Sequence, residues 1–284
     1  MSESNLKKQW NKVSTTGDPL VGERIWRRIS RRIDKKYPFV VSTVAAAILL
    51  LIGLFGWNLS RNSVTESPKE TPQQFIVGAS KGTHTKVALP DGTSVIINAG
   101  SSLSYTSEFN KVSRDVFLEG EAYFDVASNP DIPFRVLTTG CSFSVFGTKF
   151  NISAYPDDEF VRGTLLEGSL RFESDKGEQL LVPGQEITFE EGHYSLQEVD
   201  ASQSCSWING DIKYDSIPFS ELCRRISRVY DVEVVLDVDE LARKKIRVSF
   251  SKEDSITTII KTLEVILPIQ IKQEGSVIYI NEKD

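Results

Sequence analysis

The chain has 284 residues, 40% of them apolar and 25% charged, which is long enough for more than one folded unit. Its formal net charge of −6 is the sum of two segments of opposite charge. Residues 1–36 carry ten Lys or Arg against four acids, whereas residues 37–284 have a net charge of −12. The three cysteines, Cys141, Cys205 and Cys223, are odd in number and widely spaced, which argues against a disulfide framework and a cysteine-bound metal.

Residues 1–36 predict two short amphipathic helices that need a partner. Asp18 and Pro19 provide an N-cap and a first helical residue for the second helix. The apolar side chains of both helices recur at helical spacing and form a candidate binding stripe: Leu6, Trp10, Val13, Val21, Ile25, Trp26, Ile29 and Ile33. A segment of this length cannot bury them in a core of its own. The stripe therefore indicates a protein partner or an anionic lipid surface, and both alternatives stay open.

Residues 37–60 carry no charge, and 24 residues of helix would be about 36 Å long at roughly 1.5 Å per residue. We therefore expect one transmembrane helix over residues 37–60. A cleaved secretory signal is disfavoured, since 36 residues precede this run and no small-residue cleavage site follows it. The basic flank predicts a cytoplasmic N-terminus. It also explains the basic residues without nucleic-acid binding, for which no recognition motif is present.

Residues 61–80 are expected to form a linker, and residues 81–200 a β domain. Short runs of alternating apolar and polar residues, separated by Gly or Pro, are typical of strands. Asp91 and Gly92 predict a hairpin turn. The sequence LEGE at residues 118–121 returns as LEGS at residues 166–169. This echo suggests stacked hairpins in a β-roll or sandwich.

Residues 207–284 predict a small α+β domain of βαββαββ order. Helices are expected over residues 219–230 and 256–267, the second with Ser255 as its N-cap. Each helix has one apolar face, so we expect both to cover one face of a sheet. The predicted fold class of the whole chain is mainly β plus α/β, with a helical N-terminal tail, one transmembrane helix, the β-roll or sandwich domain and the small C-terminal domain.

The residues that usually carry catalysis are scarce. A Ser or Cys nucleophile needs a base within hydrogen-bond reach, and the two histidines, His84 and His193, are predicted to face solvent. No phosphate-binding loop and no His or Cys spacing of a metal site occurs. We therefore expect a binding protein without enzyme activity, cofactor or metal.

The paired carboxylates have a structural interpretation. Glu119 with Glu121, and Asp157 with Asp158, fit hairpin edges and loops better than acid–base catalysis. Among the thiols, Cys205 falls in a linker and is interpreted as free. Cys141 alternates with apolar strand residues and Cys223 shares helical spacing with apolar residues, so both point toward cores.

Several motifs in order resemble those of the FecR-like anti-sigma factors, single-pass regulators of extracytoplasmic-function sigma factors in Gram-negative bacteria. The most specific is RDVFLEGEAYFDV at residues 114–126. The others are LPDGT at 89–93, NAGS at 98–101, PFRV at 133–136, FGTKFNI at 146–152 and LEGS at 166–169, with WING at 207–210 in the C-terminal part. The motif glycines Gly120, Gly147 and Gly168 are expected to permit tight turns, and Phe124, Phe134 and Phe150 to fill the β domain.

The resemblance implies that the stripe in residues 1–36 binds an extracytoplasmic-function sigma factor. It further implies an inner-membrane location with a periplasmic C-terminus, and a cue from the signalling domain of an outer-membrane TonB-dependent transporter. Release would involve proteolysis in or near the membrane, and no direct contact with nucleic acid is implied. The alternatives are a membrane-anchored envelope protein whose β domain binds glycan or another envelope protein and, third, an enzyme.

Overall fold

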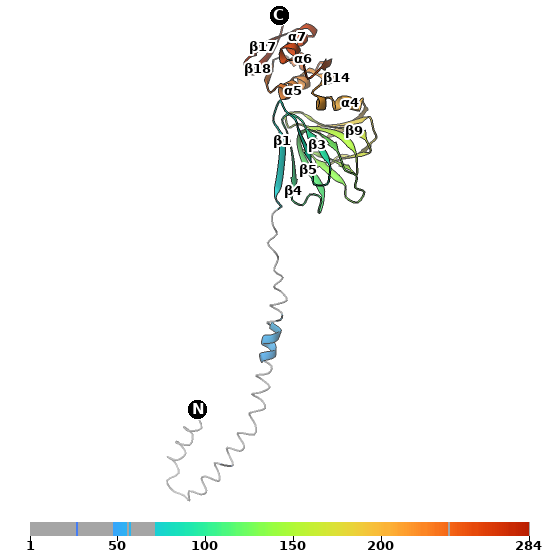
Figure 1. Cartoon of the computed structure of the whole chain (residues 1–284), viewed down its shortest axis with the longest axis vertical. Helices are drawn as coiled ribbons and strands as arrows, with labels where there is room; N and C mark the ends of the chain where they lie inside the picture. Colours follow the sequence, from blue (N-terminus) through green and yellow to red (C-terminus); the bar gives the residue numbers. More distant parts are fainter. Residues whose placement is uncertain (1–26, 28–47, 56, 58–71, 238, 284) are drawn as a thin grey trace, which may run out of the picture. The chain divides into compact units, whose positions relative to one another are not determined.

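The structure is a computed structural model that describes residue 27, residues 48–55, residue 57, residues 72–237 and residues 239–283. The chain divides into two units, Met1–Glu70 and Thr71–Asp284 (Figure 1). Nearly all of the second unit is described, and it consists of strands with a few helices.

The described part of the first unit is helical, at Arg27, residues 48–55 and Trp57. No helix in the described part of the chain is long and apolar enough to cross a membrane. The prediction of a transmembrane helix over residues 37–60 is therefore not supported, and the fold class is corrected to a mostly β structure with a few helices.

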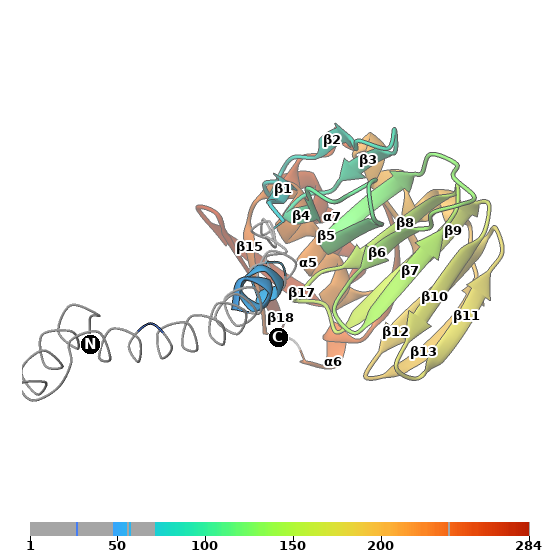
Figure 2. The same cartoon turned by 90° about the horizontal axis from the view of Figure 1, so that it is seen from below.

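A β-sandwich, here called the sandwich lobe, occupies residues 74–198. Its strands are β1 (Gln74–Ala79), β2 (Thr85–Ala88), β3 (Ser94–Ile97), β4 (Ser101–Thr106), β5 (Arg114–Asp125), β6 (Phe134–Leu137), β7 (Cys141–Val145), β8 (Lys149–Ala154), β9 (Phe160–Glu167), β10 (Leu170–Ser174), β11 (Gly177–Leu181), β12 (Gln185–Glu190) and β13 (His193–Glu198). One layer has the order β1-β4-β5-β6-β7-β10-β11, and the other the order β2-β3-β5-β8-β9-β12-β13. Figure 2 shows β6, β7, β10 and β11 side by side in the first layer.

Strand β5 belongs to both layers because the chain changes layer at Gly120. Residues before Gly120 pair with β4 and β6, and those from Gly120 onward pair with β3 and β8. Gly120 has a φ of 100°, and a Cβ there would overlap the Ser101 side chain. Gly168, with a φ of 93°, lies where the chain passes from β9 to β10 in the opposite layer. The repeated LEG triplet thus marks two corners of the sandwich, which only glycine forms without strain.

Aromatic side chains fill the space between the layers. Phe124, Phe134 and Phe150 are all fully buried, which confirms their predicted role in the interior. The rings of Phe124 and Phe150 stack with centroids 5.0 Å apart, and Phe134 lies 5.9 Å from Phe124. These rings belong to one continuous core that does not include the C-terminal residues.

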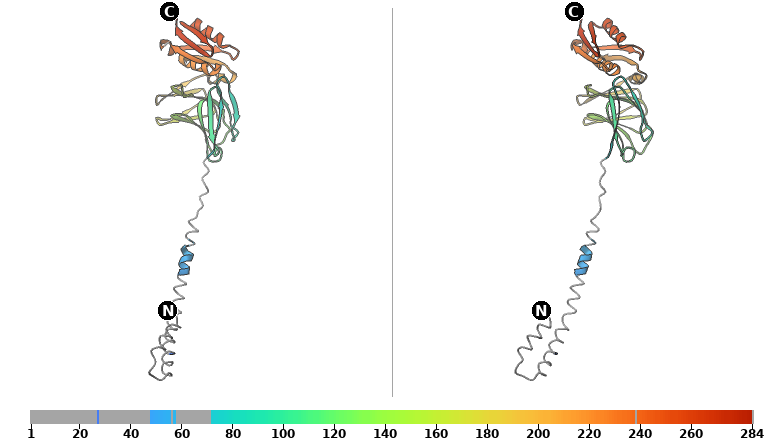
Figure 3. Two further views of the ribbon diagram at one scale, coloured as in Figure 1. Left: turned by 90° about the vertical axis from the view of Figure 1, so that its left-hand side faces the viewer. Right: turned by 60° about the vertical axis from the view of Figure 1, so that its left-hand side comes forward.

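The C-terminal lobe, residues 201–282, lies beside the sandwich lobe (Figure 3). It has a core of its own. Its elements are α4 (Ala201–Ser204), the 3₁₀ helix η1 (Ser206–Asn209), β14 (Ile212–Pro218), α5 (Phe219–Tyr230), β15 (Glu233–Asp237), α6 (Asp239–Ala242), β16 (Lys245–Phe250), α7 (Ile256–Ile266), β17 (Ile269–Glu274) and β18 (Val277–Glu282). Ser255 caps α7 as predicted, its Oγ accepting a hydrogen bond from the Thr258 N–H at 3.2 Å.

The strands of the C-terminal lobe form two sheets, where the sequence analysis expected one. Strands β14 and β16 pair with each other, while β15 runs parallel to β18 and β17 antiparallel to it. The short helix α6 is a further addition to the predicted order. The reason for the difference is that alternation along a strand indicates which face is buried, but not which strand lies beside it.

Candidate functional site at the junction of the two lobes

The sandwich lobe contributes a buried polar face to the junction. Side chains alternate between the two faces of a strand, so that in β8 Phe150 and Ile152 enter the core while Asn151 and Ser153 point the other way. The C-terminal lobe covers this outward face. The polar side chains buried there are Glu121 of β5, Asn151 and Ser153 of β8, Thr164 of β9 and Glu186 of β12.

Helix α5 contributes the facing surface, because both of its sides are buried. Leu222 and Ile226 enter the core of the C-terminal lobe. Glu221, Arg225 and Arg228 recur at i, i+4 and i+7 on the other side and are also buried. A helix that buries charged side chains needs oppositely charged partners nearby.

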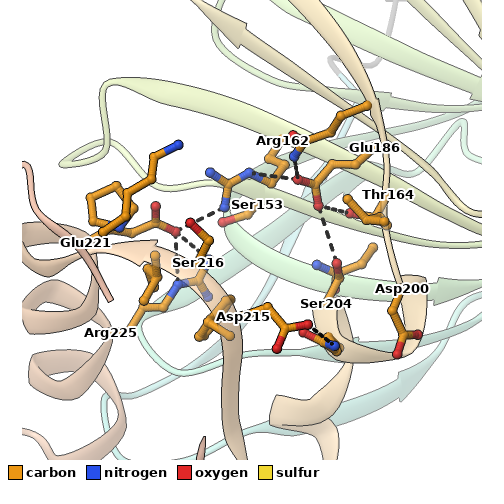
Figure 4. A pocket seen from close by; sticks show the side chains of 18 of the residues that line it. Ser153, Arg162, Thr164, Glu186, Asp200, Ser204, Asp215, Ser216, Glu221 and Arg225 are labelled. Atoms are coloured by element: carbon orange, nitrogen blue, oxygen red, sulfur yellow. Dashed lines mark hydrogen bonds and ion pairs between the residues drawn. The ribbon is translucent and has the colours of Figure 1, made fainter. Parts of the chain in front are cut away.

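A first charge cluster joins Glu121, Arg162 and Glu186 of the sandwich lobe to Glu221 and Arg225 of α5. Figure 4 shows the last four of these side chains. Arg225 lies 3.3 Å from Glu121 (Nη1 to Oε2) and 3.1 Å from Glu221 (Nη2 to Oε1). Arg162 donates from Nη1 to Glu221 at 3.0 Å, and its Nε lies 3.4 Å from Glu186. Opposite charges therefore alternate along the cluster and cross the junction twice.

A second charge cluster lies at the loop between β8 and β9. Arg224 Nε donates to Asp158 at 2.6 Å, and Arg228 Nη2 lies 2.6 Å from Asp157 and 3.0 Å from Asp158. The guanidinium of Arg228 also lies over the Tyr155 ring, 3.6 Å from its centroid. The Asp158 side chain is fully buried. This carboxylate pair lies in a loop, as predicted, and binds the arginines of α5 there.

The pKa values of Glu221 and Arg225 both favour the ionised form at neutral pH. Burial raises the pKa of the Glu221 carboxyl, but Arg225 and Arg162 outweigh this effect and leave the pKa below its ordinary value. Burial lowers the pKa of Arg225, but Tyr214 and the carboxylates Glu121 and Glu221 hold it well above its ordinary value. The first cluster thus sets three carboxylates against two guanidinium groups, an excess of one negative charge.

The segment between the lobes also packs into the junction. Trp207 of η1 is buried, and its Nε1 donates to Asn151 Oδ1 at 3.2 Å. Ser204 of α4 lies 3.3 Å from Glu186. Cys205 is buried between these residues, and burial raises the pKa of its thiol to about 12. Cys205 is a free cysteine, as predicted, but it is buried, because the segment that contains it folds into α4 and η1 and packs onto the sandwich lobe.

A cavity of about 440 Å³ lies beside the first charge cluster (Figure 4). Strands β8, β9 and β12 line one side, β14 and α5 line the opposite side, and the segment from the end of β13 through α4 lines a third. Six carboxylate side chains and three basic ones border it. A ligand or partner group in this cavity would touch both lobes at once, which makes it the candidate functional site.

The residues predicted to bind a partner lie outside the described residues. They are Leu6, Trp10, Val13, Val21, Ile25, Trp26, Ile29 and Ile33. His84 and His193 are exposed, as predicted. Within the described residues, no group of three or more His, Cys, Asp or Glu side chains is arranged to hold a metal ion.

The junction itself was missed in the sequence analysis, and Glu121 is the clearest case. Its alternation with Ala122 indicates correctly that it points away from the core, but it is 2% exposed because the second lobe covers it. The charged stripe Glu221, Arg225 and Arg228 on a helix with an opposite apolar face was the available signal. A helix with two such faces suggests a second packing partner.

Comparison with known proteins identifies the family of the chain. The FecR protein model matches residues 76–182, and the model of the FecR C-terminal domain matches residues 211–280. The chain belongs to the FecR family. The two matched ranges of this FecR-family chain correspond to the sandwich lobe and the C-terminal lobe on either side of the junction.

Solved structures similar to this FecR-family chain include two crystal structures of a proposed anti-sigma factor from Parabacteroides distasonis ATCC 8503, at 1.65 and 2.50 Å resolution. Each is 27% identical in sequence, with a TM-score of 0.70. The matches cover 74% and 75% of this chain and 100% of the other chain. No curated protein matches the chain.

Proposed function

We propose that this FecR-family chain is an anti-sigma regulator. The observation that carries the proposal is the match to the proposed anti-sigma factor from Parabacteroides distasonis, which extends over the whole of that chain and accompanies both FecR models in order. Family and neighbour point to regulation by binding and not to an enzyme.

The regulator binds an extracytoplasmic-function sigma factor through residues 1–36. The apolar stripe of this segment supports this part of the proposal, because it is too small to form a core and is flanked by ten basic residues. A sigma factor that buries the stripe would be held away from RNA polymerase.

The C-terminal lobe receives the cue, from the signalling domain of an outer-membrane TonB-dependent transporter. The charged character of the junction supports this part. The two lobes have separate cores and meet through two charge clusters, an arrangement more typical of movable domain interfaces than of a shared apolar core. A partner that competes for Arg225 or Arg228 would weaken the contact between the lobes. The proposal places both lobes in the periplasm, which protease accessibility in spheroplasts would test.

The test of sigma binding is a pull-down of the host's extracytoplasmic-function sigma factors with the full-length chain. The double variant Ile29→Glu/Ile33→Glu places two charges on the stripe and is expected to abolish capture. The matched control Ser14→Glu/Ser30→Glu adds the same two charges to the same segment outside the stripe, and it should retain capture.

Two results would contradict the proposal. Capture of no sigma factor by the unaltered chain would remove the sigma-binding role and favour an envelope protein that binds glycan. Equal capture by the stripe variant and its control would assign binding to another part of the chain.

A further inference from the structure

The cavity at the junction contains two polar groups that the protein leaves without a hydrogen-bond partner. Ser153 Oγ and Arg162 Nε are buried atoms, and neither has a hydrogen-bond partner among the described residues. Arg162 Nε lies 3.4 Å from Glu186, but not in a hydrogen-bonding direction. Unpartnered buried polar atoms are rare in folded proteins, and a water molecule or a ligand atom can satisfy them.

These two groups stand next to each other. Ser153 of β8 and Arg162 of β9 are direct partners in the antiparallel register, so that their side chains project from the same face of the sheet. Both line the cavity (Figure 4). Both can donate a hydrogen bond, and Arg162 can only donate. Together they call for an acceptor with two oxygen atoms or lone pairs, such as a carboxylate.

Two charged side chains of opposite sign at the rim of the cavity have neither an ion pair nor a side-chain hydrogen bond among the described residues. Glu198, at the end of β13, and Lys245, at the start of β16, are exposed and make no ion pair with any other described residue. The remaining rim carboxylates are engaged, Asp200 with Ser202 and Asp215 with Arg247. Glu198 is thus available for an ammonium group.

The charge balance narrows the ligand class. Six carboxylates against three basic side chains disfavour a net anion such as phosphate. The unpartnered donors disfavour a simple polyamine, which has no acceptor for them. A volume of about 440 Å³ falls within the range of roughly 300–1,000 Å³ that small-molecule sites occupy.

We propose that the cavity binds a small zwitterion of the amino-acid or short-peptide type, with its carboxylate at Ser153 Oγ and Arg162 Nε and its ammonium group at Glu198. The three proposed contacts lie in the sandwich lobe, and β14 and α5 of the C-terminal lobe line the opposite side of the same cavity. A ligand that fills the cavity and also contacts this side favours the closed junction over any arrangement in which the lobes separate. The proposal goes beyond sigma binding and does not depend on it.

The test is isothermal titration calorimetry of the purified full-length chain without any sigma factor. Diglycine is the reference probe, N-acetyl-diglycine lacks the ammonium group, and diglycine amide lacks the carboxylate. Either blocked probe is expected to bind at least about tenfold more weakly than diglycine, because each loses a hydrogen bond to a charged group. Glycine and triglycine distinguish a free amino acid from a longer peptide as the natural source.

Three variants locate the binding site. Ser153→Ala should weaken diglycine at least about fivefold without lowering the melting temperature, because the hydroxyl has no protein partner. Glu198→Gln should weaken diglycine but leave N-acetyl-diglycine unchanged. The control Ser195→Ala, on the exposed strand β13 outside the cavity, should change neither probe.

The proposal is overturned if diglycine, triglycine and glycine all fail to bind at millimolar concentration. It is overturned equally if N-acetyl-diglycine, diglycine amide or glucose binds as tightly as diglycine, or if Ser153→Ala leaves the affinity unchanged. None of these outcomes bears on sigma capture, so the two proposals fail or stand separately.

Discussion

Arg225→Met should weaken the contact between the two lobes and lower the free energy of unfolding. Arg225 is 7% exposed and donates from Nη1 to Glu121 and from Nε and Nη2 to Glu221. Methionine has a similar length without a charge, so the substitution leaves little empty space but removes the cation from between two carboxylates. Both carboxylates are 2% exposed and cannot regain water without movement of the lobes.

The magnitude follows from the cost of a buried unpaired charge. Removal of one member of a buried ion pair typically costs about 3–5 kcal/mol. With a urea m value near 2.5 kcal/mol/M, a loss of about 4 kcal/mol lowers the denaturation midpoint by roughly 1.5 M. The control Arg247→Met breaks a pair with Asp215 in which the side chains are 78% and 58% exposed. Such a surface pair contributes about 1 kcal/mol at most.

Trp207 provides the assay, since it is the only tryptophan beyond residue 57 and its indole contacts Asn151 across the junction. Urea denaturation would be followed by its fluorescence in a chain whose other three tryptophans are replaced by Phe. Circular dichroism reports the strands of both lobes in the same samples. In Arg225→Met, the fluorescence transition should move to lower urea, ahead of the transition seen by circular dichroism.

A double-variant cycle distinguishes charge from packing. Glu121→Gln alone should lower the free energy of unfolding. Added to Arg225→Met, it should restore part of the lost stability, because it removes one of the buried carboxylates that the first substitution leaves unpaired. A loss below about 1 kcal/mol in Arg225→Met would refute the reasoning that Arg225 neutralises buried carboxylates between the lobes. Purely additive effects of the two substitutions would refute the proposed coupling.

Three further predictions concern single residues. The pKa of Glu221 lies below its ordinary value of 4.5. The ionised Glu221 side chain therefore stabilises the fold fully above pH 4.5, and this stabilisation is lost as the pH falls through the lowered pKa. Glu221→Gln should remove this pH dependence from an acid-unfolding profile. The thiol of Cys205 has a pKa of about 12, so at pH 8 only about one molecule in ten thousand carries it as a thiolate. Maleimide should therefore label Cys205 far more slowly in the native chain than in urea. Rapid labelling of the native chain would contradict the burial of this residue. Gly120→Ala should destabilise the chain by about 2 kcal/mol or more, because its φ is 100° and the new Cβ meets Ser101, and a smaller loss in urea denaturation would show that the corner can relax.

The local features of the sandwich lobe could be predicted from the sequence because they depend on neighbours along the chain. The hairpin turn at Asp91 and Gly92 joins β2 to β3, and Gly92 N–H donates to the Leu89 carbonyl at 3.0 Å. Alternation along β5 and β8 placed Phe124 and Phe150 in the interior. Turn chemistry and period-two patterning are properties of a few consecutive residues.

The junction could not be predicted in this way. The patterns around Glu121 and Asp158 indicate that these side chains leave the core, but whether they meet water or a second lobe depends on contacts between residues far apart in sequence. Glu121 is 104 positions from Arg225, and Asp158 is 66 from Arg224. Uncharged length alone likewise led to the unsupported transmembrane helix over residues 37–60.

The two charge clusters restrict which lobes can be combined in a hybrid protein. Several ion pairs have one member in each lobe: the acids Glu121 and Asp158 lie in the sandwich lobe, and their bases Arg225, Arg224 and Arg228 lie in the C-terminal lobe. A chimera that takes its C-terminal lobe from a relative with other residues on α5 would bury unmatched carboxylates, even if both halves fold well. Chimeras between relatives should therefore exchange the outward face of β5, the loop after β8 and α5 together, from the same parent.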